Sequence, residues 1–457
     1  MTPLVVALQI ALATPAPPAL PALPAPPAPA ERAETAGRTE AAQSSDSFPM
    51  LTLADALARS LRLNPDYVAA LGRVGESEWA RTAAKVAFFV PSAQASLDYT
   101  KYSQAFFNIG TFNQSSTAST FNLSASYDIF SARKFTELSR TAAELENATA
   151  TEAKTRYAAA LLTEAAYYDV LAGQELTRAA EQRSARAEEA LRVARARVSS
   201  GAAVQSDSLS VRLELVRAQV ALLIQGSSLR VARLELGRRA GIDGPAGAAP
   251  LDSAPPPGLP ITLPQAVAQA LEQGPEYRAA RAAERAAEAD LKGRRGAYLP
   301  TLNLTAAHSR FDVGLFPNAS NVSSLTITAS LSLWNNGLRE LQIRQSNTNR
   351  DVARAVRADL ERAALRDVTA AYDTYETARA SFTLASDALV VARENYRVNQ
   401  ARYQGGAITV IELITAQNGL TDAESGVVSA RYAARLALAR LEAILGTRLL
   451  QTQGGNQ

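Results

Sequence analysis

Few residues in this sequence have the type and spacing of a catalytic or metal-binding site. The 457 residues include no cysteine, which excludes disulfides, thiol catalysis and thiolate metal sites. The single histidine is His308, and we interpret it as structural because a catalytic or metal-binding histidine needs suitable partners. The sequence also lacks H-E-x-x-H, G-x-S-x-G and phosphate-loop motifs. We therefore expect no enzyme activity, no cofactor and no metal. The small formal charge of +3 gives no support to nucleic-acid binding.

Among the acidic residues, Glu412 has the neighbouring sequence that says most about local structure. It ends the segment Arg402–Glu412, in which Gly406 can adopt the left-handed conformation that terminates a helix. Thr409 stands three residues before Glu412, which is the spacing of a capping box. A parallel segment, Arg197–Asp207, also runs from a glycine to a carboxylate. We therefore expect two glycine turns, each joining one helix to the next.

The elements around these turns occur twice in the sequence. The segment Leu51–Tyr67 parallels Ile261–Tyr277, and Arg197–Gly201 parallels Arg402–Gly406. A Pro/Gly/Ala-rich segment separates the copies. The sequence therefore predicts a two-fold internal repeat, with the first copy at 49–245, a linker at 246–260 and the second copy at 261–449.

Each copy has the same predicted order of elements. A helix begins at a cap, Thr52 or Thr262, and ends near a proline; two strands, a very long helix, the glycine turn and another long helix follow. The range Leu338–Gln404 contains neither Gly nor Pro and predicts a helix about 100 Å long. Its large apolar residues recur every seventh position, which predicts coiled-coil packing. They are Val368, Tyr375, Phe382, Leu389, Tyr396 and Tyr403.

Four segments alternate between apolar and polar residues, as strands do. They are Ala93–Tyr102, Phe121–Ile129, a strand beginning at Leu302, and Ser324–Trp334. Strands of roughly ten residues fit a tilted crossing of a bilayer, but four cannot close a membrane barrel. Strands of a soluble sandwich alternate in the same way. If the protein is membrane-bound, however, copies must pool their strands, two giving eight and three giving twelve. We expect a lipid-facing set of Phe121, Leu123, Leu325, Ile327, Leu331 and Leu333, and a lumen-facing set of Ser124, Ser126, Thr326, Thr328 and Ser330.

The two ends of the chain differ in composition from the repeats. Residues 1–13 contain an apolar run that resembles a signal peptide, although no Lys or Arg precedes it. Residues 14–48 read as a Pro/Ala-rich and polar leader, and residues 450–457 as a polar tail. No other run approaches the roughly 18 apolar residues of a transmembrane helix.

Taken in order, these motifs resemble the TolC family of outer-membrane efflux proteins from Leu51 to Leu449. The motifs that support this resemblance are LxxALxxxLxxNP at Leu53–Pro65, the similar segment at Leu263–Pro275, the aromatic residue at the strand end before each long helix, and the RYxxG turn followed by an acidic residue at Arg402–Glu412. The resemblance implies a mainly α fold with a β-barrel portion. Long antiparallel coiled-coil helices would form a periplasmic α-barrel, and the four strands would contribute to a homotrimeric twelve-stranded barrel in the outer membrane.

The resemblance also implies partners and a function. The duct would carry small molecules such as drugs or metal ions passively out of a tripartite pump, bound to a periplasmic adaptor and an inner-membrane pump. Two alternatives remain open, a type I protein secretion duct and a structural periplasmic coiled-coil protein. The adaptor would dock on Arg197, Gly201, Ala202, Ala203, Arg402, Tyr403, Gly405, Gly406, Ala407 and Ile408. Gate candidates are Asp207, Glu412 and Thr415, although Glu412 could be a helix cap alone.

Overall fold

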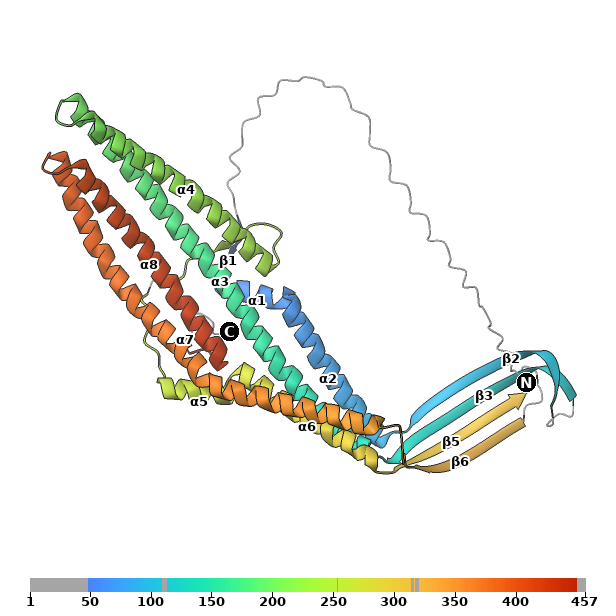
Figure 1. Cartoon of the computed structure of the whole chain (residues 1–457). Coiled ribbons are helices and arrows are strands. Elements are labelled where there is room, and N and C mark those ends of the chain that lie inside the picture. The colour runs from blue at the N-terminus through green and yellow to red at the C-terminus, as the bar shows by residue number, and fades with distance from the viewer. Residues whose placement is uncertain (1–47, 109–112, 253, 314–315, 317–319, 450–457) are drawn as a thin grey trace, which may run out of the picture. The chain divides into compact units, whose positions relative to one another are not determined.

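The described part of the chain is mainly helical and contains one four-stranded sheet (Figure 1). The structure is a computed structural model, and it describes residues 48–108, 113–252, 254–313, 316 and 320–449. The predicted signal peptide, residues 14–47 of the predicted leader and the predicted tail at 450–457 lie outside the described residues.

The two halves of the chain contain the same elements in the same order. The first half consists of β1 (Met50–Leu51), α1 (Leu53–Leu63), α2 (Pro65–Phe89), β2 (Ser92–Asn108), β3 (Asn113–Phe130), α3 (Ala132–Ser199) and α4 (Gln205–Ala240). The second consists of β4 (Gly247–Ala248), α5 (Leu263–Gln273), α6 (Pro275–Arg295), the 3₁₀ turn η1 (Gly296–Tyr298), β5 (Thr301–Asp312), β6 (Ser320–Ser330), α7 (Leu338–Gln404) and α8 (Val410–Leu445). The duplication itself remains a prediction from the sequence.

The predicted helix at the start of each copy is two helices. The helices break at Asn64-Pro65 and at Gly274-Pro275, where the residue before proline has an extended ψ of 118° or 129°. Proline disfavours the helical conformation in the residue before it and has no N–H to continue the ladder, so the single-helix prediction was wrong at this point. The predicted start is confirmed, because the Thr52 hydroxyl accepts a hydrogen bond from the Asp55 backbone N–H at 3.1 Å.

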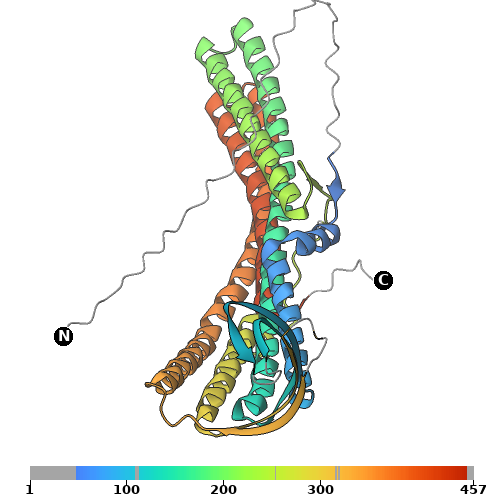
Figure 2. The same ribbon diagram turned by 90° about the vertical axis from the view of Figure 1, so that its right-hand side faces the viewer.

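The four long helices form two hairpins that lie side by side, α3 with α4 and α7 with α8 (Figures 1 and 2). The prediction of one uninterrupted helix over Leu338–Gln404 is confirmed, and its 67 residues extend about 100 Å. Its seam is also confirmed: Val368, Tyr375 and Tyr403 are almost fully buried, and Leu389 is half-buried. Heptad spacing therefore places these side chains against neighbouring helices.

The sheet has the strand order β2-β3-β5-β6, and each neighbouring pair is antiparallel. It is visibly curved (Figure 2). Within the described residues, β2 and β6 each have a neighbour on one side only. The predicted strand Ser324–Trp334 is too long at its end, because β6 stops at Ser330. Ser330 pairs with Thr301, and the next residue of the partner, Pro300, has no N–H for the ladder.

The predicted linker at 246–260 is fixed to both halves. Strand β4 pairs in parallel with β1. The Tyr167 hydroxyl on α3 lies 2.8 Å from the Ala249 carbonyl oxygen, and the Tyr375 hydroxyl on α7 donates to the Pro257 carbonyl oxygen at 2.5 Å. The segment is therefore a packed connection.

Candidate functional site: the helix turns and the strand faces

The two glycine turns have matching backbone geometry. Gly201 and Gly406 have φ values of 75° and 77°, the left-handed region that L-residues with a side chain avoid. In the first turn the Ala202 N–H donates to the Arg197 carbonyl at 2.8 Å, and in the second the Ala407 N–H donates to the Arg402 carbonyl at the same distance. This six-to-one bond defines the Schellman ending of a helix.

Arg197 connects the two turns. Its Nη1 donates to the Tyr403 carbonyl oxygen at 2.7 Å, and its guanidinium lies 4.7 Å from the centre of the Tyr403 ring. Its Nη2 also reaches the Ala202 carbonyl oxygen at 3.4 Å. One side chain therefore holds together the tips of two hairpins whose turns are distant in sequence.

Below the turns, the two hairpins share a hydrophobic cluster. Ile408 and Tyr403, which the sequence analysis placed in the exposed docking turn, are 9% and 2% exposed. They pack with Leu191 of α3 and Leu413 of α8. These two predicted docking residues are thus inaccessible in this chain and support the turn from inside. The exposed residues of the turns are Gly201, Ala202, Arg402, Gly405, Gly406 and Ala407, and Ala203 is half-buried.

Glu412 caps α8, as the spacing predicts. The Thr409 N–H donates to Glu412 Oε2 at 2.8 Å, and the Glu412 N–H donates to Thr409 Oγ1 at 3.3 Å. The hydrogen bond from the Thr409 N–H lowers the pKa of the exposed Glu412 carboxyl, so it stays ionised. The other two gate candidates differ. Asp207 is half-buried in the first turn of α4, and the exposed Thr415 donates its hydroxyl to the Ile411 carbonyl of its own helix at 2.9 Å.

Ion pairs join the two hairpins along their length. Arg186 of α3 and Glu424 of α8 form a two-pronged pair, with Nη2 2.9 Å from Oε2 and Nη1 3.3 Å from Oε1. Nearer the sheet, Arg431 of α8 contacts Glu175 of α3 at 2.8 Å. The sequence analysis missed these pairs, because each joins residues more than 230 positions apart and no local spacing indicates them.

The strand register places the predicted apolar residues of the strands on one face. Phe121 pairs with Leu97 of β2, and Ile327 pairs with Leu304 of β5. Paired residues in neighbouring strands share a face. Leu123 pairs with His308, whose Nδ1 lies 2.9 Å from Ser323 Oγ. The predicted lipid-facing residues Leu331 and Leu333 lie beyond the end of β6, so they do not belong to this strand face.

The opposite face of the sheet is polar and internally hydrogen-bonded. Asn303 Nδ2 donates to Ser126 Oγ at 3.0 Å and to Asp128 Oδ1 at 2.8 Å. Thr328 pairs with Asn303 and therefore shares this face. All five residues predicted to face the lumen belong to it: Ser124, Ser126, Thr326, Thr328 and Ser330.

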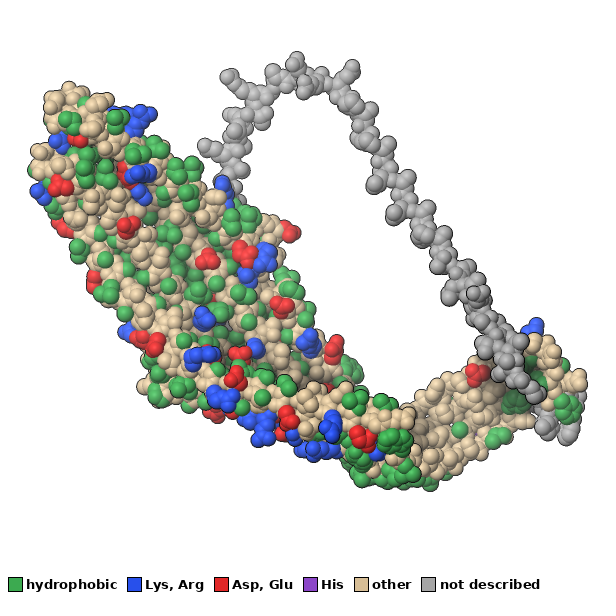
Figure 3. Space-filling view, in the orientation of Figure 1, with side chains coloured by type: hydrophobic (Ala, Val, Ile, Leu, Met, Phe, Trp, Pro, Cys, Tyr) green, Lys and Arg blue, Asp and Glu red, His purple; other side chains and the backbone are tan. Residues whose placement is uncertain are grey.

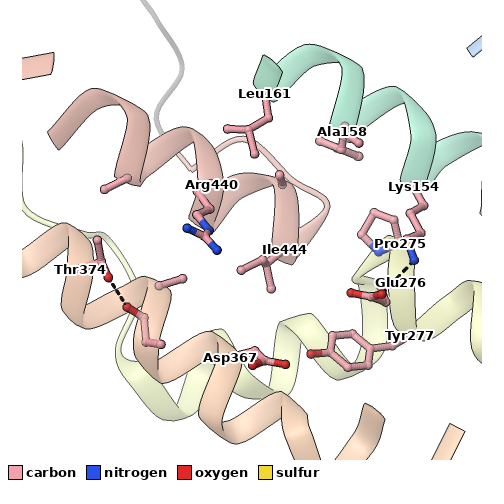
Figure 4. Close-up of a pocket in the computed structure, with 15 residues that line it drawn as sticks. Lys154, Ala158, Leu161, Pro275, Glu276, Tyr277, Asp367, Thr374, Arg440 and Ile444 are labelled. Atoms are coloured by element: carbon pink, nitrogen blue, oxygen red, sulfur yellow. Dashed lines mark hydrogen bonds and ion pairs between the residues drawn. The ribbon is translucent and has the colours of Figure 1, made fainter. Parts of the chain in front are cut away.

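A cavity of about 440 Å³ lies where α3, α6, α7 and α8 meet (Figure 4). Lys154 and Glu276 form an ion pair at 2.8 Å there, and Arg440 and Asp367 line other parts of the wall. None of these residues is a predicted site residue.

In the described ranges no cluster of three or more His, Asp or Glu side chains is arranged to hold a metal. Among the helices that the structure describes, none is both long enough and apolar enough to span a membrane.

Comparison with known proteins places the chain among outer-membrane proteins. The sequence model of the family described as outer membrane efflux protein matches residues 56–241 and 266–447. The chain is 29% identical over 311 residues to the outer membrane efflux protein BepC of Brucella suis, an alignment that covers 66% of each protein.

Solved structures have the same fold. The CmeC outer membrane channel of Campylobacter jejuni matches with a TM-score of 0.75 at 14% identity, over 88% of this chain and 87% of that one. The open MtrE outer membrane channel of Neisseria gonorrhoeae matches with a TM-score of 0.69 at 20% identity, over 87% and 89%. The family match covers well over half of the sequence, so the chain belongs to the outer membrane efflux protein family, the TolC family, and is an outer-membrane protein with a periplasmic extension.

Proposed function

We propose that three copies of this chain form the outer-membrane exit duct of a tripartite efflux pump. The observation that carries this proposal is the four-stranded sheet, which has one mainly apolar face, one polar face and two edges that the described part of the chain leaves unpaired. Unpaired backbone groups in lipid cost several kcal/mol each, so the edges need strands from other copies.

Three copies suit a duct better than two. Two copies would supply eight strands, which close a barrel that side chains fill, while three supply twelve and leave room for a lumen. The polar face, with Ser126 and Thr328, would line that lumen, and the apolar face, with Phe121 and Ile327, would meet lipid. The paired hairpins would continue the wall into the periplasm.

The glycine turns are the proposed docking site for the periplasmic adaptor. Gly201, Ala202, Gly406 and Ala407 are exposed at the tips and carry no bulky side chain. Arg197 holds the two turns in a fixed relation, which would present one composite surface to a helical-hairpin partner. The family's description as efflux proteins favours export of small molecules over protein secretion, and an outer-membrane protein does not fit a purely structural periplasmic role.

Two measurements test the proposed duct. Native mass measurement in mild detergent should give three subunits, and the same preparation should conduct ions across a planar bilayer. A stable monomer that conducts would contradict the trimer, and a trimer that never conducts would contradict the duct.

Glu412 is the proposed gate residue among the three candidates. Three copies would place three exposed carboxylates at the periplasmic end, and the cap keeps each one ionised. Glu412→Gln retains an acceptor for the Thr409 N–H and removes the charge. We expect higher conductance with unchanged adaptor binding, and conductance equal to the parent would show that Glu412 serves only as a cap.

A further inference from the structure

The cavity of about 440 Å³ between α3, α6, α7 and α8 contains a buried hydroxyl group without a partner (Figure 4). Tyr277, near the start of α6, is 4% exposed and lines this cavity. Its hydroxyl makes no hydrogen bond with any described residue, although buried tyrosine hydroxyls usually find one. Figure 4 shows this hydroxyl directed along the cavity toward Asp367. Because an unpartnered buried hydroxyl destabilises a protein, this arrangement favours a bound polar molecule.

The surroundings of the Tyr277 hydroxyl are negative. Asp367 is paired with Arg366 through Oδ1 at 2.8 Å, and its Oδ2 has no contact with a described residue. Burial raises the pKa of Tyr277, and the charges of Asp367 and Glu276 raise it further, while Arg366 opposes them more weakly. A hydroxyl oxygen and a carboxylate oxygen both accept hydrogen bonds, so this end of the cavity can hold an ammonium group.

The opposite end of the cavity contains a free cation. Arg440 of α8 lines the cavity, is exposed, and forms no ion pair or hydrogen bond with a described residue. Lys154, the other cation of the lining, is paired with Glu276 at 2.8 Å. The charges of the lining balance, because Lys154 and Arg440 are matched by Glu276 and Asp367. A ligand with one ammonium and one carboxylate group fits both ends and preserves this balance.

The separation of the two ends limits the length of the ligand. Arg440 stands six residues before Gly446, so the two positions are about 9 Å apart along α8. Gly446 contacts the start of α6, where a Cβ on this glycine would lie only 2.8 Å from Pro275 Cδ, and Tyr277 is two residues further on. The two charged groups of the ligand must therefore be several ångströms apart. An extended dipeptide spans about 7 Å, whereas in a single amino acid one carbon joins the two groups.

The middle of the cavity is apolar. Leu161 of α3 and Ile444 of α8 are half-buried and line it, together with alanines of α3, α7 and α8 at positions 158, 370, 371, 437 and 443. Ile444 lies one helical turn after Arg440 on the same face of α8, toward the Tyr277 end. An apolar side chain between the two charged groups of the ligand would be removed from water against these residues.

The position of the cavity along the helices favours a water-soluble ligand over a lipid. Asp367 stands 29 residues after Leu338, the first residue of α7, so it lies about 43 Å along the helix from the end next to the sheet. Hydrophobic side chains gather where the helices meet the sheet (Figure 3). The cavity is far from that surface, and it is also separate from the glycine turns.

We propose that this cavity binds a short zwitterionic peptide of two residues with an apolar C-terminal side chain. The ammonium group would lie between the Tyr277 hydroxyl and Asp367 Oδ2, and the carboxylate would bind the Arg440 guanidinium. The apolar side chain would contact Leu161 and Ile444. The site uses neither the strand faces nor the glycine turns, so this proposal does not rest on the proposed duct.

The test is isothermal titration of the purified full-length protein in mild detergent with four ligands. They are alanyl-leucine, its N-acetyl form without an ammonium group, its C-terminal amide without a carboxylate, and leucine alone. We expect saturable binding of one alanyl-leucine per chain, and binding about tenfold weaker or less for each of the other three.

Each ligand tests one part of the site. Equal binding of the N-acetyl form would overturn the ammonium position, equal binding of the amide would overturn the role of Arg440, and equal binding of leucine would overturn the length of the ligand. If alanyl-leucine shows no saturable binding at millimolar concentration, solvent alone fills the cavity and the site is refuted.

Two variants and two controls locate the site. Arg440→Gln should weaken alanyl-leucine binding about tenfold and leave binding of the amide unchanged, because the amide has no carboxylate for the guanidinium. Tyr277→Phe should weaken alanyl-leucine binding about fivefold through loss of one hydrogen bond. The controls are Arg354→Gln, which removes an exposed cation of α7, and Tyr396→Phe, which alters a buried tyrosine of α7; neither residue lines the cavity, so both should bind like the parent.

Parental binding in both site variants, or an equal loss in both controls, would refute the site. Conductance of the same samples reports on the duct separately. A conducting trimer that does not bind alanyl-leucine overturns the peptide site alone, and a protein that binds alanyl-leucine without conducting overturns the duct alone.

Discussion

The pair Arg186–Glu424 should hold the two helical hairpins together. Both side chains are largely buried, with 18% and 11% of their surface exposed. Glu424→Gln removes the negative charge and leaves the Arg186 guanidinium in a poorly solvated place, 5.9 Å from the Tyr396 ring. Breaking a fully buried pair costs about 3–5 kcal/mol; we discount this for the remaining exposure and take about 2 kcal/mol.

This free energy sets the size of the expected effect. About 2 kcal/mol corresponds to roughly a thirtyfold change in an equilibrium between joined and separated hairpins. If separation widens the periplasmic end, Glu424→Gln should raise the open fraction in planar-bilayer recordings by a similar factor. The double variant Arg186→Glu/Glu424→Arg restores opposite charges and should recover much of the closed state.

Glu189→Gln is the matched control. Glu189 pairs with Arg192 within α3, and these side chains are 41% and 76% exposed. An exposed pair of this kind contributes about 0–1 kcal/mol, so the control should record like the parent. The reasoning fails if Glu424→Gln also records like the parent, or if Glu189→Gln opens the duct equally.

Three further predictions concern the sheet, the turn and a buried carboxyl. Ile327→Arg should reduce membrane-inserted trimer far more than Thr328→Arg, because a cation facing mid-bilayer lipid costs ~2–4 kcal/mol while the other face is polar; equal yields would contradict the assigned faces. Gly406→Val should lower adaptor affinity about tenfold, because strain at a φ of 77° costs about 1–2 kcal/mol, whereas Gly419→Val, within α8 and away from both turns, should bind normally in the same assay. Burial raises the pKa of Glu164 despite its contact with Arg448, so this group favours folding below its unfolded pKa, and that contribution is lost as pH rises through its folded pKa. Glu164→Gln should therefore have higher thermal stability than the parent at neutral pH, and the difference should shrink as pH falls toward 4.5. A difference that does not depend on pH would show that Glu164 does not titrate.

Local patterns in the sequence were sufficient for most of the secondary structure. A helix with no Gly or Pro over Leu338–Gln404, a capping box at Thr409 and Glu412, and a left-handed Gly406 each depend on neighbouring residues. Alternation along β3 and β6 likewise fixed which residues share a face, because a strand turns its side chains to opposite sides in succession.

The sequence alone determined the long helices, the turns and the two faces of the sheet, because backbone propensities and side-chain periodicity act over a few residues. Only the tertiary structure decided that Ile408 is buried, that Arg186 meets Glu424 across 238 residues, and that β6 ends opposite Pro300. These outcomes depend on which distant surfaces pack together. The same is true of the cavity beside Ser131 and Arg133, which forms only where α2 packs against the start of α3.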